Sequence, residues 1–451
     1  MVKKDEHYTT EITGISSDGN GVGTIDGFTV FVPHTAAGDT AEIAIDKVSS
    51  RFAQGRLTRL IAPSPDRKEP VCPIFYECGG CHLQHIKYAA QLDAKRGIIE
   101  AAFRRIGGFK DFRCDDMIGM DTPERYRNKC IFQIGTDNSG KLIYGFYANK
   151  SHSVIPVKDC ITGIEENAGL CAALIEYMRE NSISAYDDKT GKGTIKRLFI
   201  RKAASTGEIM AAVSINADNL PKREQLIKRL RNSDSNVKSI YININKDKRN
   251  SGLGQKNILI YGSAEISDTL CGAEFGISPQ SFYQVNPCMT EKLYSKALEY
   301  ADIRERDTVL DVYCGIGTIS LAAAKKAGQV IGIEIVEQAV ADAERNAERN
   351  GINNAKFLAD SAENAVPALI KSGMTPDIVI LDPPRKGSDE ATLCAIAKAS
   401  PKRIVYVSCN PATLARDAKY LAAAGYAPVK CTGVDMFPHT NHVETVCLFL
   451  K

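Results

Sequence analysis

The regular alternation of apolar strands and helices after residue 270 constrains the fold of this chain most strongly. The continuous apolar stretches Thr308–Tyr313 and Gln329–Glu334 are each followed by a segment in which apolar residues recur at helical spacing. Two further stretches of the same kind end at Asp382 and Ser408. Unbroken apolar strands between helices are typical of a parallel sheet that is covered on both faces. The final segments, Tyr426–Asp435 and His442–Leu450, lie close enough in sequence to form an antiparallel pair.

The N-terminal part of the chain has a different pattern. Its short β-prone stretches alternate with turns that contain Gly and Asp, which predicts a small OB-like barrel of a kind that often binds oligonucleotides. A proline-bearing linker, a cysteine-rich stretch, a helix from Tyr88 to about Ile106 and a mixed α/β pattern follow. We therefore expect three domains, formed by residues 1–62, 63–268 and 269–451. Within the second, residues of about 88–124 are expected to pack with the third domain.

Composition places the chain among ordinary globular proteins, with 44% hydrophobic and 25% charged residues. No apolar run approaches the roughly 18 residues of a membrane span, and the N-terminus lacks the apolar stretch of a secretory signal. We expect a cytoplasmic monomer without membrane contact. A net charge of +3 says little about nucleic acid. Three local basic clusters could neutralise phosphates: Arg125–Lys129, Lys196–Lys202 and Lys246–Arg249. Tyr126, in the first, could stack on a base. The alternative for each cluster alone is a solvated surface.

A glycine loop, Asp311–Thr318, lies at the carboxyl end of a predicted strand, where open parallel sheets bind ligands. Its two glycines let the backbone approach a ligand closely. Glu334 ends the next strand, where a carboxylate can accept hydrogen bonds from ribose hydroxyls. Ser320 replaces the third glycine of a dinucleotide fingerprint, so S-adenosylmethionine, which has no pyrophosphate, fits better than NAD. The alternative is an ordinary strand–helix turn without a ligand.

Three side chains that could take part in a reaction are expected at the same sheet edge. Cys409 follows one strand, Asp382 ends another, and Glu444 begins the final strand, whose start reaches this edge if it runs antiparallel. A thiolate that adds to C6 of uracil makes C5 nucleophilic, and a carboxylate can afterwards remove the C5 proton. A uracil within structured RNA would have to be unstacked to enter. The alternative for Cys409 is a buried structural cysteine.

Four ordered motifs resemble those of the RNA uracil-C5 methyltransferase family over nearly the whole chain: Asp311–Thr318, Leu381–Gly387, Ser408–Thr413 and His442–Val446. The resemblance implies a TRAM barrel, a central α/β domain and a Rossmann-like methyltransferase domain. It also implies that Cys409 is the nucleophile and Glu444 the base, and that Arg125–Lys129 lies near RNA. The S-adenosylmethionine contacts implied are Gln284, Tyr313, Glu334 and Asp382.

A cysteine cluster stands apart from these motifs: Cys72, Cys78, Cys81 and Cys160. Its spacing leaves zinc, an iron–sulfur cluster and free thiols open. The resemblance to ribosomal members of the family implies a [4Fe–4S] cluster and favours 23S ribosomal RNA as the substrate. Fourteen cysteines without a secretory signal argue against a disulfide framework. The remaining cysteines are interpreted as structural: Cys114, Cys130, Cys171, Cys271, Cys288, Cys314, Cys394, Cys431 and Cys447.

Three other functions stay open at this point. The first is uracil-C5 methylation of transfer RNA. The second is methylation of an exocyclic base nitrogen, as Asp382-Pro-Pro would suggest, although Arg385 stands where such enzymes carry an aromatic residue. The third is RNA binding without catalysis on a relic methyltransferase fold, against which the intact Cys409 and Glu444 count.

Overall fold

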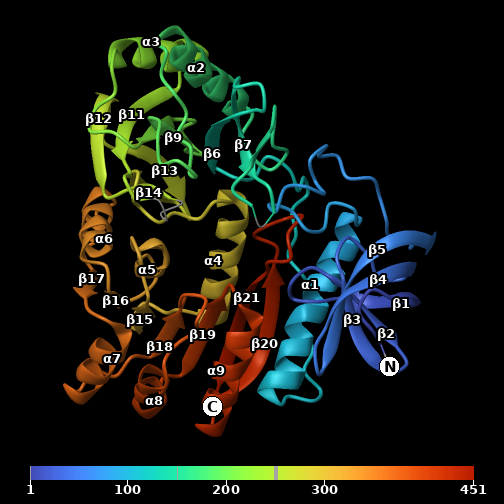
Figure 1. The fold of residues 1–451 in the computed structure, drawn as a ribbon. Coiled ribbons are helices and arrows are strands. Elements are labelled where there is room, and N and C mark those ends of the chain that lie inside the picture. The colour runs from blue at the N-terminus through green and yellow to red at the C-terminus, as the bar shows by residue number, and fades with distance from the viewer. Residues whose placement is uncertain (1, 150, 248–251) are drawn as a thin grey trace.

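The C-terminal sheet of the computed structural model has seven strands in the order β17-β16-β15-β18-β19-β21-β20 (Figure 1). The model describes residues 2–149, 151–247 and 252–451. The pairs from β17 to β19 are parallel, and β21 is antiparallel to both of its neighbours. The predicted parallel sheet and its antiparallel last pair are confirmed. The strands are β15 Thr308–Val312, β16 Gln329–Glu334, β17 Ala355–Ala359, β18 Ile378–Leu381, β19 Arg403–Ser408, β20 Ala427–Val434 and β21 Glu444–Leu450.

Helices cover both faces of this sheet. Successive strand residues point to opposite sides, so the apolar strands present apolar side chains on both faces. Val309 packs into the core formed with α4, α5 and α6, whereas its neighbour Leu310 packs into the core formed with α7, α8 and α9. The helices are α4 Pro287–Ala301, α5 Thr318–Ala324, α6 Glu337–Arg349, α7 Ala362–Lys371, α8 Glu390–Ala399 and α9 Pro411–Ala423.

The N-terminal strands close into a barrel in the order β1-β2-β3-β5-β4. Alternate residues such as Ile12, Val30 and Ile43 are buried inside it, as the period-2 pattern predicts. The strands are β1 His7–Ile15, β2 Gly21–Ile25, β3 Phe28–Val32, β4 Thr40–Val48 and β5 Phe52–Ala62.

The central sheet has seven mixed strands in the order β12-β11-β10-β9-β6-β7-β8. Helices α2 (Asn167–Glu180) and α3 (Arg223–Ser233) pack on one face, and the hairpin β13–β14 (Ile266–Leu270 and Ala273–Ile277) separates the other face from α6. The strands are β6 Lys129–Thr136, β7 Leu142–Tyr147, β8 Val154–Pro156, β9 Ile195–Lys202, β10 Ile209–Ile215, β11 Val237–Ile244 and β12 Lys256–Gly262.

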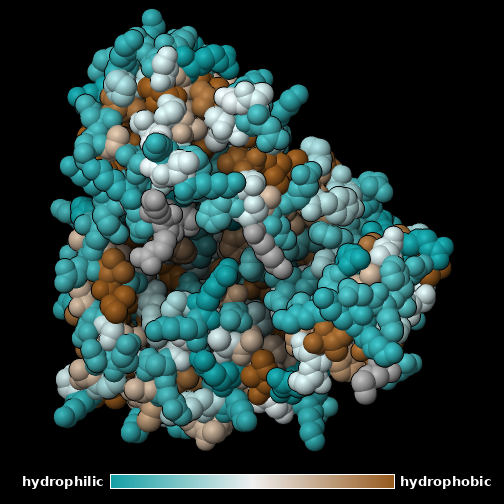
Figure 2. All heavy atoms as spheres, in the orientation of Figure 1, coloured by the Kyte–Doolittle hydropathy of each residue, from teal (hydrophilic) through white to brown (hydrophobic). Residues whose placement is uncertain are grey.

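Helix α1 (Tyr88–Ala102), which continues as a π-helical turn to Gly107, joins the barrel to the C-terminal domain. It lies between the two and packs against β1, β20 and α9 (Figure 1). The space-filling view shows a largely hydrophilic face that is hollowed between the central sheet above and the C-terminal sheet below (Figure 2). Within the described ranges, no helix is both long and apolar enough to cross a bilayer.

One disulfide is present among the described residues, although the sequence argues against a disulfide framework. Cys431 of β20 and Cys447 of β21 are register partners, and their sulfur atoms are bonded. Side chains directly opposite one another on antiparallel strands have neighbouring Cβ atoms, so the register brings these two thiols together.

Candidate active site

The glycine loop after β15 turns back onto the end of β16. The backbone amides of Tyr313 and Cys314 both donate to the Ile333 carbonyl at 2.9 Å. Gly315 N–H then donates to Glu334 Oε2 at 3.1 Å, which ties the loop to the predicted ribose-binding carboxylate. Gly315 has φ +57°, in the left-handed region that glycine adopts without strain. A Cβ built on it meets no atom within 4 Å, so the backbone borders open space there.

An orphaned carboxylate oxygen and exposed apolar side chains lie on or directly after the strands that flank this loop. Asp311 is fully buried; its Oδ2 accepts from Ser320 Oγ at 2.5 Å, and its Oδ1 has no hydrogen-bond partner among the described residues. Burial raises the pKa of Asp311 to about 6. Ile335 and Val336, which follow Glu334, are 66% and 53% exposed. A carboxylate for a cationic group, a second for hydroxyls and an apolar platform for a flat ring fit S-adenosylmethionine.

A buried polar network holds Tyr313, the first residue after β15. Its hydroxyl lies 3.1 Å from Ser388 Oγ. The Ser388 amide donates to Asp417 Oδ2 at 2.9 Å, and the same carboxylate oxygen accepts from the Tyr406 hydroxyl at 2.6 Å. Asp417 is 2% exposed, and Arg416 contributes a further bond to its other oxygen. The loop after Asp382 is thereby fixed to helix α9.

The strand register brings Cys409 and Glu444 together. Ser408 of β19 is paired with Thr445 of β21, so Cys409, one residue further, faces Glu444, one residue earlier. Glu444 is 4% exposed, whereas Cys409 is only partly buried. Asp382 lies close enough to influence the ionisation of both. The structure thus places these three predicted residues at one edge of the sheet.

The three groups share one electrostatic environment. Burial, reinforced by the charge of Asp382, raises the pKa of Glu444 to about 8. Burial also raises the pKa of Asp382 to about 7 and, together with Glu444 and Asp382, that of Cys409 to about 11. Arg385 opposes these shifts at Glu444 and Cys409 because its positive charge favours their anions. Perturbed titrating groups that lie close together are typical of a catalytic centre.

Gln284 lies next to Tyr294, whose ionisation Asp382 and Glu444 also influence. Its backbone carbonyl accepts from Asn128 Nδ2 at 3.0 Å, and its side chain bonds to the hydroxyl of Tyr294 on α4. Burial, followed by the charge of Asp382, raises the pKa of Tyr294, while bonds to Thr318 and Gln284 oppose this shift. Sequence reasoning missed Tyr294, whose helical position resembles that of any core tyrosine.

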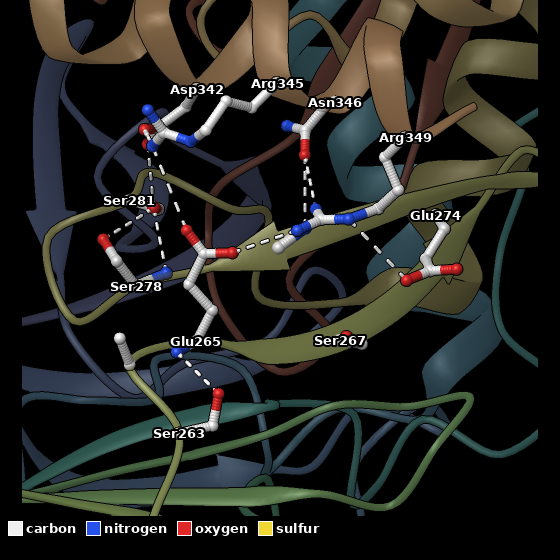
Figure 3. A network of polar contacts seen from close by, with 12 residues as sticks. Ser263, Glu265, Ser267, Glu274, Ser278, Ser281, Asp342, Arg345, Asn346 and Arg349 are labelled. Atoms are coloured by element: carbon white, nitrogen blue, oxygen red, sulfur yellow. Dashed lines mark hydrogen bonds and ion pairs between the residues drawn. The ribbon is translucent and has the colours of Figure 1, made fainter. Parts of the chain in front are cut away.

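The segment before Gln284 is held from two sides. Arg201 of β9 is 1% exposed and donates to the carbonyls of Ser278 and Ser281 at 3.0 and 3.1 Å. The Ser281 hydroxyl donates to Asp342 of α6 at 3.3 Å. Figure 3 shows this contact within a wider network in which Arg345 and Arg349 of α6 reach Glu265 beside β13.

The cations of the Lys196–Lys202 cluster are engaged inside the protein and are not available to RNA phosphates. Arg201 is buried, Lys196 donates to the carbonyls of Asn245 and Asp247 at 3.1 and 2.8 Å, and Lys202 pairs with Glu166. Strand β9 is covered on both faces, so its cations bond within the protein.

The Arg125–Lys129 segment also differs from expectation. Tyr126 is 6% exposed and donates to the Pro438 carbonyl at 3.1 Å, so it does not present a ring for stacking. The Arg125 guanidinium pairs with Asp159 at 2.7 Å. Lys248 and Arg249, in the third basic cluster, lie outside the described residues.

The four clustered cysteines line one cavity of about 540 Å³ between the cysteine-rich stretch and the central sheet. None of them is disulfide-bonded. In residues 2–149, 151–247 and 252–451, no group of three or more His, Cys, Asp or Glu side chains is arranged to hold a single metal ion. Burial raises the pKa of the Cys81 thiol to about 12. The cavity therefore brings four thiols to one place without forming a compact mononuclear site.

Known proteins match this chain along its full length. An RNA methyltransferase of Clostridium tetani is 43% identical over 447 residues, 99% of this chain and 97% of the relative, and one of Caldanaerobacter subterraneus is 44% identical over 99% and 98%. The crystal structure of the Pyrococcus abyssi tRNA (uracil-54, C5)-methyltransferase with S-adenosyl-L-homocysteine is 27% identical. It covers 98% of this chain and 100% of its own, with a TM-score of 0.77.

Two family models divide the chain between them. The TRAM domain model matches residues 4–58, the closed barrel. The model of the tRNA (uracil-5-)-methyltransferases matches residues 87–451, which include α1 and both large sheets. The chain therefore belongs to the S-adenosylmethionine-dependent RNA uracil-5-methyltransferase family.

Proposed function

We propose that this enzyme methylates uracil C5 in RNA with Cys409 as the nucleophile and Glu444 as the base. The observation that carries the proposal is the strand register, which sets a partly exposed thiol opposite a buried carboxylate at the cofactor edge. Methylation of an exocyclic amine needs neither a thiol nor this base. The family membership and the raised pKa of Glu444, to about 8, also speak against a relic fold that only binds RNA.

In the proposed reaction the Cys409 thiolate forms a bond to C6, and the C5=C6 electron pair moves toward O4 as an enolate. C5 then forms a bond to the methyl group that bound S-adenosylmethionine supplies. Glu444 accepts the C5 proton, the C5=C6 bond re-forms, and the C6–sulfur bond breaks to release the thiolate. Cys409 directly precedes Asn410, the N-cap of α9, where the helix dipole stabilises an anion.

We further propose that the cofactor is held by the four residues around the glycine loop: Gln284, Tyr313, Glu334 and Asp382. Glu334 is already oriented by the amides of Gly315 and Val336, at 3.1 and 2.9 Å, which leaves its remaining acceptor capacity for ribose hydroxyls. Tyr313 is oriented through Ser388.

A [4Fe–4S] cluster is our proposal for the cysteine cavity. Cubane clusters are bound by four cysteine thiolates. Each thiolate binds a different iron, so the four sulfurs stand further apart than the ligands of one ion, in keeping with four thiols around a roomy cavity. Cys160 comes from the central domain and the other three from the stretch after the barrel, so a cluster would fasten these parts together.

The RNA class has two candidates. The barrel and the cysteine set resemble those of ribosomal members, and we propose 23S ribosomal RNA as the substrate. Transfer RNA is the second candidate because the Pyrococcus abyssi transfer-RNA enzyme aligns with 98% of this chain, barrel included.

The test is release of tritium from RNA labelled at uracil C5, with S-adenosylmethionine, by the parent enzyme and by Cys409→Ala. Release from 23S ribosomal RNA by the parent alone supports the proposal. Tritium release only from transfer RNA would identify transfer RNA, the second candidate, as the substrate. Methyl transfer without tritium release would contradict C5 as the methylated atom.

A further inference from the structure

The segment between β20 and β21 begins directly beside Glu444, the proposed base. Val434, the last residue of β20, is the register partner of Glu444, and Asp435 follows it directly. The Asp435 amide donates to the Ile118 carbonyl at 2.9 Å, which fixes the backbone at this point from the outer side. A shift of Asp435 would therefore move the strand that borders Glu444.

Asp435 takes part in an ion pair from which water is excluded. Its Oδ1 lies 2.5 Å from Nζ of Lys95 on α1, and neither side chain has any exposed surface. Lys95 Nζ also donates to the Phe437 carbonyl at 3.0 Å. One ammonium group from the helix beside the barrel thus holds two points of the segment that leads to Glu444.

The residues between and after these points are held as well. Asn286, the N-cap of α4, donates to the Met436 carbonyl at 3.0 Å. Tyr126 donates to the Pro438 carbonyl at 3.1 Å. The Gln91 side chain, one helical turn before Lys95, accepts from the His439 amide at 3.0 Å. Every residue from 435 to 439 is bonded to a side chain from elsewhere in the chain. Among these bonds, only those of Lys95 are charge-assisted.

We propose that Lys95 is a positioning residue for Glu444, an inference that rests on the proposed role of Glu444 as the base. A buried ion pair adds little stability over apolar side chains of similar volume. Its effect here is on geometry, because it fixes the strand end beside the carboxylate that must reach the C5 proton. The polar contacts of Lys95 lie on the β20–β21 segment, whereas Cys409 is carried by β19 and the start of α9.

This division predicts which reaction step Lys95 affects. Thiolate addition to C6 and methyl transfer to C5 depend on Cys409 and the cofactor pocket. Removal of the C5 proton, with re-formation of C5=C6 and loss of the C6–sulfur bond, depends on Glu444. A displaced Glu444 should leave the first two steps intact and trap the methylated RNA on Cys409.

The experiment compares Lys95→Met with the parent, using the C5-tritiated RNA, ribosomal or transfer, that the parent methylates. Tritium release is measured together with the fraction of enzyme linked to RNA on a denaturing gel. We expect release to slow about 100-fold, the effect of a misplacement of roughly 1 Å, and the linked fraction to rise as in Glu444→Gln.

Arg67→Met is the matched control, because it removes the cation from another buried carboxylate. Arg67 Nε lies 2.8 Å from Oδ1 of Asp39, which is fully buried beside the barrel. This variant should release tritium at the parent rate without accumulating linked RNA. The double variant Lys95→Met/Asp435→Leu removes both charges, so no unpaired carboxylate remains to hinder folding, and it should also accumulate linked RNA.

Three outcomes would overturn the inference. Parent-like release by folded Lys95→Met or by the double variant would show that the pair does not position Glu444. Slower release without linked RNA would place the defect before methyl transfer. A parent enzyme that releases no tritium from either RNA would overturn the proposed function itself, and the inference with it.

Discussion

Ser408 of β19 is the register partner of Thr445 of β21, and this single pairing sets Cys409 opposite Glu444. Because β21 runs antiparallel to its neighbours, its first residue lies at the edge where the parallel strands end. The proposed nucleophile and base can therefore come from adjacent strands without a long loop. Strands β19 and β21, which lead to these two residues, are each hydrogen-bonded on both sides.

Replacement of the two groups should separate the two halves of the reaction. Cys409→Ala should abolish both tritium release and RNA linkage, because no bond to C6 forms. Glu444→Gln should retain linkage and lose about 10²- to 10⁴-fold in release, the usual contribution of a general base. Denaturing gels and tritium counting measure both, and linked RNA in Cys409→Ala would contradict the assignment.

The pH profile should follow the raised pKa of Glu444. The carboxylate must be ionised to accept the C5 proton, and its pKa in the free enzyme is about 8, so the rate of tritium release should rise with pH through that value. The Cys409 thiol, whose pKa is about 11, must also ionise, so release should continue to rise above pH 8. The Arg385 charge lowers the pKa of both Glu444 and Cys409. Arg385→Gln should move the rising limb to higher pH, and Arg385→Lys should leave it near its original place. An unshifted profile in Arg385→Gln would refute the electrostatic role.

Asp417 should act on cofactor affinity from a distance. It holds the Ser388 amide at 2.9 Å, and Ser388 Oγ lies 3.1 Å from the Tyr313 hydroxyl. Asp417→Asn weakens this support by about one hydrogen bond, ~1 kcal/mol, and should raise KM for S-adenosylmethionine about fivefold with little change in kcat. Asp307→Asn is the control: Asp307 is 8% exposed and accepts from the Arg304 amide, but lies at the opposite edge of the sheet. Equal effects in both variants would refute a local role.

Iron content should depend on the cavity cysteines alone. Anaerobically purified parent should be brown and hold about four irons per chain if the cavity carries a [4Fe–4S] cluster. Cys160→Ser should lose most of this iron, whereas Cys288→Ser, at an exposed position on α4, should keep it. Stoichiometric zinc in place of iron would contradict the proposed cluster.

Arg201→Met should impair folding stability but not RNA electrostatics. The guanidinium holds the carbonyls of Ser278 and Ser281 inside the protein. Its loss should lower the free energy of unfolding by about 2–4 kcal/mol. The slope of log affinity against log salt should stay unchanged, because no phosphate contact is removed. A shallower slope would show that Arg201 reaches RNA after all.

Much of the site could be predicted because its signals are local in sequence. The glycine loop, Glu334 and Cys409 each follow a recognisable apolar strand, and parallel strands end at one edge. Glu444 could be added because a short connection implies an antiparallel last pair. The four cavity cysteines also meet, although what they bind stays a prediction, as do the domain boundaries, the monomer and the cellular location.

The failures have a common physical origin in burial, which local sequence does not disclose. A run such as Lys196–Lys202 suggests a basic surface, yet β9 is covered on both faces and its cations find internal acceptors. The sequence around Tyr126 and Tyr294 is compatible with either a surface or a core position, and only the tertiary contacts show that both are buried. The supports of the site, Asp417 and Lys95, act through partners that no local pattern connects to them.

The Lys95–Asp435 pair also has a consequence for the order of assembly, because its partners are 340 positions apart in the chain. Contacts that close so long a loop tend to form late, after the enclosed parts have folded. Ribosomal synthesis adds to this order, since β21 is made after the barrel, the central sheet and the cofactor loop. A nascent chain can thus acquire its cofactor pocket first, while turnover waits until the last strand has been fastened to the helix beside the barrel.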